Sequence, residues 1–167
     1  MTNYSQFKPW SVKKLIPCFI LFVCMLNVSG QPSEYATGKL IITFTDIRSD
    51  VGQIALALYN QESQWTDNPA KEYAWDKDNM KNGRLTVTIE DLPRTVYAIA
   101  VLDDENENLE MEYTLGLPTE GWGMSTNPSF LKLKKPGFDE VFFDLDAPVI
   151  RMEIKMNYIR KNKKVKD

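Results

Sequence analysis

Hydrophobic and polar residues alternate with a period of two along most of this chain, and helical spacing is rare. Alternation of this kind places apolar side chains on one face of a strand and polar side chains on the other. The pattern predicts strands over residues 40–44, 54–58, 73–75, 85–89, 96–102, 141–145 and 150–158. The last of them alternates apolar and polar residues without interruption, which is typical of a half-buried strand.

Turn-forming residues separate these segments. Residues 48–52 lie between the first two strands, and Asn82-Gly83 precedes the fourth. Residues 96–102 are apolar on both faces, which predicts a central place in a sheet. Residues 67–72 could open one short helix. About seven short strands with such separators predict an all-β domain, an antiparallel β-sandwich.

The first thirty residues have the features of a signal peptide. Three lysines within residues 8–14 precede an apolar run over residues 15–26, and small residues follow at 28–30. This order predicts cleavage before Gln31. A spanning helix needs about 20 apolar residues, so we expect no transmembrane segment in the mature form. An uncleaved membrane anchor is the alternative that the sequence leaves open.

The predicted organisation has four parts, which are a signal peptide at 1–30, a flexible N-terminal segment at 31–37, a β-sandwich at 38–158 and a basic disordered tail at 159–167. The length that remains after cleavage suffices for one domain with its own core. The tail could contact an anionic membrane or glycan, although a solvated C-terminus is the simpler interpretation.

Composition excludes several kinds of chemistry. The chain has no histidine, and its two cysteines, Cys18 and Cys24, lie in the predicted signal peptide. The mature protein therefore has no imidazole base, thiol nucleophile or disulfide, which excludes serine–histidine and cysteine–histidine hydrolases. After cleavage 17 basic and 23 acidic residues remain, a balance that predicts no nucleic-acid partner. A small exported domain without disulfides fits a bacterial periplasm or cell surface.

An acidic loop that follows residues 96–102 is the candidate metal site. Asp104, Asn106 and Asn108 occupy positions 1, 3 and 5 of an oxygen-ligand loop. Glu110 could add its backbone carbonyl at position 7, and Glu112 falls at position 9. Oxygen donors at alternate positions suit calcium, which is therefore the predicted cofactor. In the alternative interpretation, the Asp and Asn side chains hold an acidic turn by accepting hydrogen bonds from backbone amides.

A stretch rich in glycine and proline, residues 116–125, follows the acidic loop. It places Trp122 between two glycines, which predicts either a platform for a glycan or peptide or an aromatic plug at the end of the sandwich. Glu120 could act as the acid of a carboxylate pair with Asp104 or Glu112, as in glycosidases.

Several short motifs occur in a characteristic order: Gly38-Lys39-Leu40, Gly52-Gln53-Ile54, Leu92-Pro93, Tyr97-Ala98, Asp104-Glu105-Asn106-x-Asn108, Gly116-x-Pro118-x-Glu120-Gly121-Trp122-Gly123-x-Ser125 and Pro128-x-Phe130. Over residues 38–158 the chain resembles the exported bacterial family known as domain of unknown function 2141. The resemblance implies an immunoglobulin- or transthyretin-like sandwich and implies no activity. The family usually has glycines where Glu107 and Leu109 stand and an aspartate where Glu112 stands, and these departures bear on metal binding.

These observations predict an exported, non-catalytic β-sandwich module of the bacterial envelope that acts in binding or as a structural element. Calcium would stabilise its acidic loop. The expected partner is an envelope protein or a glycan. The alternative function is a small carboxylate-dependent hydrolase that acts on glycans.

Overall fold

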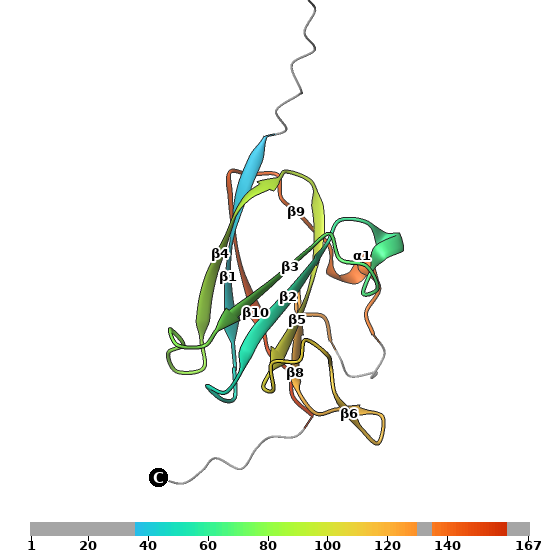
Figure 1. Cartoon of the computed structure of the whole chain (residues 1–167). Coiled ribbons are helices and arrows are strands. Elements are labelled where there is room, and N and C mark those ends of the chain that lie inside the picture. Colours follow the sequence, from blue (N-terminus) through green and yellow to red (C-terminus); the bar gives the residue numbers. More distant parts are fainter. Residues whose placement is uncertain (1–35, 130–134, 160–167) are drawn as a thin grey trace, which may run out of the picture. The chain divides into compact units, whose positions relative to one another are not determined.

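A computed structural model describes residues 36–129 and 135–159 (Figure 1). The predicted signal peptide at 1–30, residues 31–35 of the N-terminal segment and tail residues 160–167 lie outside the described residues. Within the described part, no helix has both the length and the apolar character needed to cross a membrane.

The body of the domain consists of two sheets, and most of its strand pairs are antiparallel (Figure 1). The smaller sheet has the order β10 (Val149–Lys155), β1 (Thr37–Thr45) and β4 (Leu85–Pro93). The larger sheet has the order β3 (Lys71–Asp76), β2 (Gln53–Tyr59), β5 (Val96–Asp104) and β8 (Gly121–Met124), and β9 (Phe143–Asp144) also pairs with β5. The exception to the antiparallel arrangement is β1 with β10, which run parallel.

Short elements complete the fold. Strands β6 (Tyr113–Thr114) and β7 (Leu117–Pro118) form a small separate hairpin. One helical turn, α1 (Phe138–Val141), and one 3-10 turn, η1 (Glu62–Gln64), lie in the connections.

One core fills the space between the two sheets. Strand alternation directs every second apolar side chain inward. The fully buried residues of this core include Leu40, Ile42, Phe44, Ile54, Leu58, Leu92, Ile99, Leu145 and Ile154. Most of them come from the alternating positions in the sequence, and the all-β prediction is confirmed.

Two predictions about individual strands are also confirmed. The segment at residues 96–102 is β5, which lies between β2 on one side and β8 and β9 on the other. Its place inside the sheet explains why both of its faces are apolar. The short alternating segment at residues 73–75 is part of β3, which contributes Tyr73 and Trp75 to the edge of the core.

Other local predictions were wrong. The helix considered at residues 67–72 is absent, because β3 already begins at Lys71 and the helical turn lies earlier, at Glu62–Gln64. The strand predicted over 141–145 is shorter in the structure: Val141 belongs to the helical turn α1, and β9 spans only Phe143–Asp144. Val141 and Leu145 are nevertheless buried as the pattern required.

Strand β8 was not predicted, because its inward positions are glycines and show no hydrophobic alternation. A Cβ at Gly123 would lie 2.7 Å from Cγ2 of Ile154, and a Cβ at Gly121 would lie 2.2 Å from the ring of Tyr158. The two glycines therefore let side chains that follow or belong to β10 pack directly on the backbone of β8.

Candidate functional site

The outer face of the larger sheet carries small side chains at its centre. Ala55 and Ala57 alternate with the buried residues of β2 and so face outward. The strand register pairs Ala55 with Ala74 of β3, and Ala57 with Ala100 of β5. These four alanines form the floor of a trough, because their short side chains leave space above the backbone.

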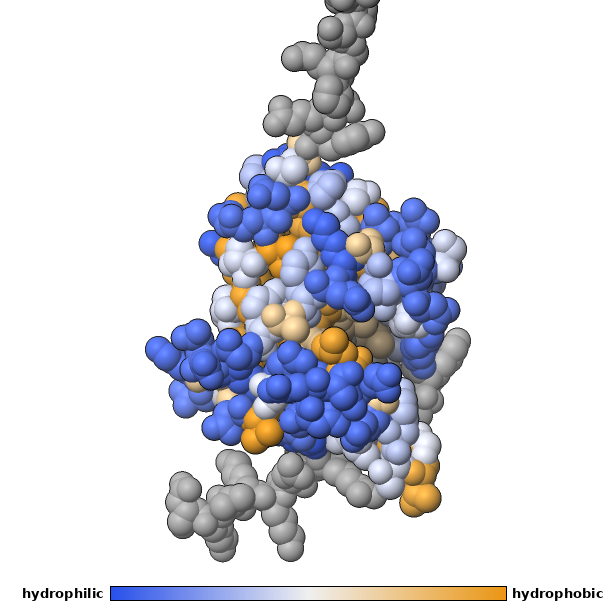
Figure 2. All heavy atoms as spheres, in the orientation of Figure 1, coloured by the Kyte–Doolittle hydropathy of each residue, from blue (hydrophilic) through white to orange (hydrophobic). Residues whose placement is uncertain are grey.

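Larger groups surround this floor. Trp122 and Met124, the outward residues of β8, line it beside β5. The trough is also lined by Thr66, Asp67, Pro69, Lys135 and Pro136, and by six of the residues from Leu109 to Pro118. In Figure 2, apolar side chains occupy the middle of the displayed face and hydrophilic side chains surround them.

A small second core supports one end of the trough. Tyr59, Trp65, Ala98 and Val141 are buried together on the outer side of the larger sheet. The ring of Trp65 packs edge-on against Tyr59 at 5.0 Å, and its Nε1 donates a hydrogen bond to the carbonyl of Pro136. This cluster fixes the connection that carries residues 66–69 beside the alanine floor.

The trough has the dimensions of a ligand site. Its volume is about 980 Å³, at the upper end of the range of roughly 300–1,000 Å³ for small-molecule pockets. Most of the lining is apolar, and its ionisable or hydroxyl side chains are Tyr59, Thr66, Asp67, Glu72, Tyr73, Tyr113 and Lys135. The trough therefore suits a ligand that presents an apolar surface.

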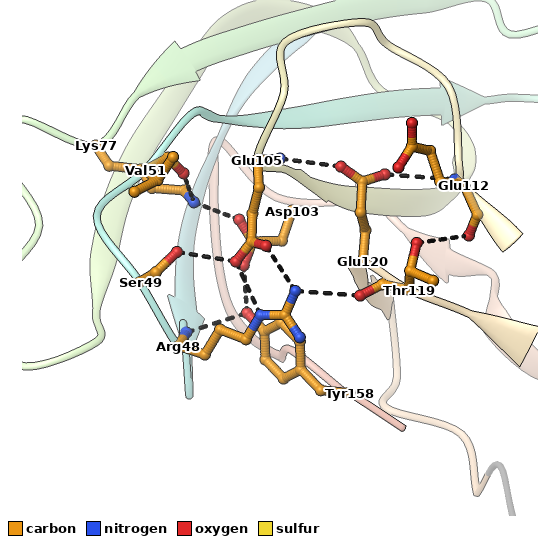
Figure 3. Close-up of polar contacts among 10 residues, drawn as sticks. All are labelled: Arg48, Ser49, Val51, Lys77, Asp103, Glu105, Glu112, Thr119, Glu120 and Tyr158. Carbon is orange, nitrogen blue, oxygen red and sulfur yellow. Dashed lines mark hydrogen bonds and ion pairs between the residues drawn. The ribbon is translucent and has the colours of Figure 1, made fainter. Parts of the chain in front are cut away.

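A buried polar cluster lies next to the start of the acidic loop (Figure 3). Lys77, which follows β3, forms an ion pair with Asp103 of β5, and both side chains are fully buried. Lys77 Nζ also donates to the carbonyl of Val51 at 2.5 Å. The hydroxyl of Tyr158 donates to the other carboxylate oxygen of Asp103. Burial raises the pKa of Asp103 and, together with the neighbouring Asp103, that of Tyr158.

A second ion pair adjoins this cluster. Arg48 donates to Glu105 through Nε at 2.8 Å and Nη2 at 2.6 Å, in a bidentate arrangement. Its guanidinium lies 4.7 Å from the centre of the Tyr158 ring. The hydroxyl of Ser49 adds a hydrogen bond to Glu105, and these donors, Arg48 first, lower the pKa of the Glu105 carboxyl.

The predicted metal ligands lie on one loop, and backbone amides occupy many of their oxygens. The fully buried carboxylate of Asp104 accepts hydrogen bonds from the amides of Asn108 and Leu109 and from the side chain of Gln53. Asn106 Oδ1 accepts from the amide of Asn108, and Asn108 Oδ1 accepts from the amide of Glu110. These hydrogen bonds are of the kind expected if the Asp and Asn side chains hold an acidic turn, the alternative to a metal site.

Two predicted metal ligands of this loop also contact each other through their side chains. Asn106 Nδ2 donates to Glu112 Oε1 at 2.9 Å. In the described part of the chain, no three Asp or Glu side chains gather closely enough to hold a metal ion. Calcium binding by this loop stays a prediction.

Glu120 is buried beneath the loop and does not face the trough. Its two carboxylate oxygens accept hydrogen bonds from the amides of Glu105, at 3.1 Å, and Glu112, at 3.4 Å. Burial raises the pKa of Glu120. A glycosidase acid must reach the glycosidic oxygen of a substrate, whereas Glu120 and Asp104 are buried and bonded to the loop backbone.

Sequence reasoning missed the two features that dominate the structure. The alanines of the trough are small and apolar, and they carry no chemical signal. Lys77 lies in a polar turn, where a lysine is ordinarily exposed. Trp122, in contrast, was singled out from the sequence and lines the trough, and its role as a platform stays a prediction.

The chain is thus a β-sandwich that carries one apolar trough and one internal polar cluster. It belongs to the family described as uncharacterised proteins conserved in bacteria, domain of unknown function 2141, whose sequence profile matches residues 42–153. No curated protein and no solved structure matches the chain.

Proposed function

We propose that the protein is an exported, non-catalytic module of the bacterial envelope that binds a partner through the trough of the larger sheet. The alanine floor is the observation that carries this proposal. Four outward positions of three adjacent strands hold alanine, where exposed strand faces usually hold larger polar or β-branched side chains.

The lining favours an apolar protein segment over a glycan. Sugar hydroxyl groups lose hydrogen bonds to water unless the site replaces them, and the floor of this trough offers only methyl groups. Trp122, Met124 and Leu102 would instead contact apolar side chains of a partner.

Binding of the fluorescent apolar probe anilinonaphthalene sulfonate tests the trough. We expect saturable binding to the folded protein, and loss of that binding in Ala55→Trp, which fills the floor from its centre. Ile41→Trp provides the matched control, because Ile41 is an outward residue of β1 in the other sheet. Equal binding by both variants, or no saturable binding by the wild type, would contradict the proposal.

Export is the second part of the proposal, and it rests on the basic, apolar and small residues of positions 8–30. We expect the protein in the periplasmic or cell-surface fraction with Gln31 at its N-terminus, as measured by intact mass. A cytoplasmic protein that retains residues 1–30 would contradict this part and leave the trough unaffected.

The third part of the proposal is that the acidic loop binds calcium. Asp104, Asn106, Asn108 and Glu112 present oxygen atoms from one loop, and the loop also lines the trough through Leu109 and Met111. Calcium at this loop would hold that wall of the trough in place. A carboxylate-dependent hydrolase stays the alternative function, and turnover of a glycan that Glu120→Gln abolishes would favour it.

A further inference from the structure

The buried pair of Lys77 and Asp103 is unusual because it lies in the interior, where ion pairs are costly. Its side chains have no exposed surface, whereas the pairs Lys39–Glu90, Arg84–Glu153 and Lys155–Asp46 are all largely exposed. Desolvation of two charges costs several kcal/mol per ion, which mutual attraction offsets only in part. A reaction that removes both charges would therefore be favoured at this position.

We propose that Lys77 and Asp103 condense to form an intramolecular amide bond, an isopeptide cross-link between the end of β3 and β5. Three arrangements carry the proposal. The amine and the carboxyl are in contact, water has no access to them, and each has a neighbour placed to bond the product.

The reaction is a condensation with no change of oxidation state. The Lys77 ammonium first transfers one proton to Oδ1 of Asp103, which leaves a neutral amine beside a neutral carboxylic acid. The amine lone pair then attacks Cγ of Asp103 and forms the new N–C bond. In the tetrahedral intermediate the negative charge lies on Oδ2, which accepts the hydrogen bond from the Tyr158 hydroxyl.

The intermediate collapses when the C–Oδ1 bond breaks. Oδ1 leaves as water with the proton it received earlier and a second proton from the attacking nitrogen. The amide that forms keeps one N–H, which is placed to donate to the carbonyl of Val51, the present partner of Lys77 Nζ. Its carbonyl oxygen keeps the hydrogen bond from Tyr158, so the product has a partner for each polar atom.

Burial supplies the driving force that amide formation lacks in water. Groups held in contact react with an effective concentration of about 10⁵–10⁸ M in favourable cases. Exclusion of water removes the reactant of the reverse hydrolysis. The fold brings together residues that are 26 positions apart, so the reaction follows folding.

Mass spectrometry of the purified, folded full chain tests the proposal. Trypsin cleaves after Lys and Arg, so an unlinked chain yields peptides 72–77 and 95–132 separately. The cross-link blocks cleavage after Lys77 and joins peptide 72–81 to peptide 95–132, with a mass lower by one water molecule. Fragmentation of this branched peptide should locate the link at Lys77 and Asp103. Separate peptides of full mass from folded wild-type protein would overturn the proposal.

Three controls distinguish the reaction from unspecific loss of water. The exposed pair Lys39–Glu90 should stay unlinked in the same digest, and a link there would overturn the explanation by burial. Tyr158→Phe removes the hydroxyl that stabilises the intermediate and should slow linking about 100-fold after refolding. Lys77→Met should yield no branched peptide. An unchanged linking rate in Tyr158→Phe would overturn the assigned role of Tyr158.

Discussion

Backbone strain occurs at two residues of the acidic loop, Glu107 and Leu109, and at Leu115 in the hairpin that follows the loop. Glu107, Leu109 and Leu115 have positive φ angles, of 61°, 61° and 52°. This left-handed conformation costs a non-glycine residue about 1–2 kcal/mol. Two of these positions, Glu107 and Leu109, are those where the resemblance to the family implies glycine, so the backbone explains that preference.

Leu109→Gly should therefore stabilise the domain by about 0.5–1 kcal/mol, since relief of strain exceeds the added freedom of the unfolded chain. Leu109 is exposed, so little packing is lost. Chemical denaturation measures the change. The control is Glu110→Gly, at a position without positive φ, which should destabilise by a similar amount. Destabilisation by both variants would show that strain is not the governing effect.

The Arg48–Glu105 pair gives a pH-dependent contribution to stability. The Glu105 carboxyl has its pKa lowered below the ordinary value of 4.5, chiefly by hydrogen bonds from Arg48. A lowered pKa in the folded state contributes stability above pH 4.5, and this contribution is lost as the pH falls through the folded-state value. Glu120 has a raised pKa and acts in the opposite direction, so a variant is needed to isolate Glu105.

Glu105→Gln should lower the free energy of unfolding by about 1–2 kcal/mol at pH 7, because a charged hydrogen-bonded pair is lost. Solvent screening moderates this effect, since 24% of the Glu105 side chain is exposed. The difference from wild type should shrink as the pH falls below 4.5. Urea melts across this range provide the measurement, with Glu90→Gln, from an exposed pair, as a control that changes little. A difference that stays constant with pH would refute the assignment.

At the scale of the element, a strand could be predicted from the sequence wherever its side chains pack against a core. The long strands β1, β2, β4, β5 and β10 follow from alternation, because one or both faces meet a core. Strand β8 could not be predicted, since it packs through glycine backbone. The parallel pairing of β1 with β10 was equally hidden, because register and direction depend on partners remote in sequence.

In the candidate site too, some features could be predicted from the sequence and others could not. Trp122 between two glycines is visible in the sequence, and so is the alternating series of Asp, Asn and Glu residues in the acidic loop. The trough exists because four alanines with short side chains lie next to one another on adjacent strands. The sequence does not show that these strands are adjacent. Lys77 follows β3 and Asp103 belongs to β5, and β2 lies between these strands in the sheet. No local sequence pattern predicts that the two side chains pair.

Strand β10 offers a direct test of its two faces. Ile154 is fully buried, and Glu153 lies on the opposite face with more than half of its side chain exposed. Ile154→Asp should cost at least 3 kcal/mol or prevent folding, because it buries an unpaired charge in the core. Glu153→Ala removes one exposed ion pair with Arg84 and should cost less than about 1 kcal/mol. Similar costs for both variants, as measured by thermal melts, would mean that the strand faces are misassigned.

At the scale of the whole molecule, the two outer faces of the sandwich differ in character. The smaller sheet presents the exposed pairs Lys39–Glu90 and Arg84–Glu153 and a hydrogen bond between Thr43 and Thr86. The larger sheet presents the apolar trough. The asymmetry supports the proposal that a partner binds the larger sheet, since the smaller one presents the polar outer face of an ordinary antiparallel sheet.

The acidic loop lines the trough through Leu109 and Met111, and calcium bound to it would stabilise the whole domain. With a dissociation constant of about 0.1 mM, typical of the tighter extracellular modules, and about 1 mM free calcium, binding contributes about 1.4 kcal/mol. The melting temperature should then rise by about 5 °C relative to chelator. Magnesium should have a smaller effect, because it keeps its waters and demands octahedral geometry.

The choice of variant for this test follows from the hydrogen bonds of the loop. Asp104→Ala is unsuitable, because Asp104 holds the amides of Asn108 and Leu109 and its loss would lower the melting temperature even in chelator. Glu112→Gln keeps an oxygen for the bond with Asn106 and removes only the charge. It should abolish the calcium shift and leave the melt in chelator unchanged, whereas Glu110→Gln should keep the shift, since Glu110 would bind through its carbonyl. If wild type melts identically in calcium and in chelator, the loop is held by its amide hydrogen bonds alone.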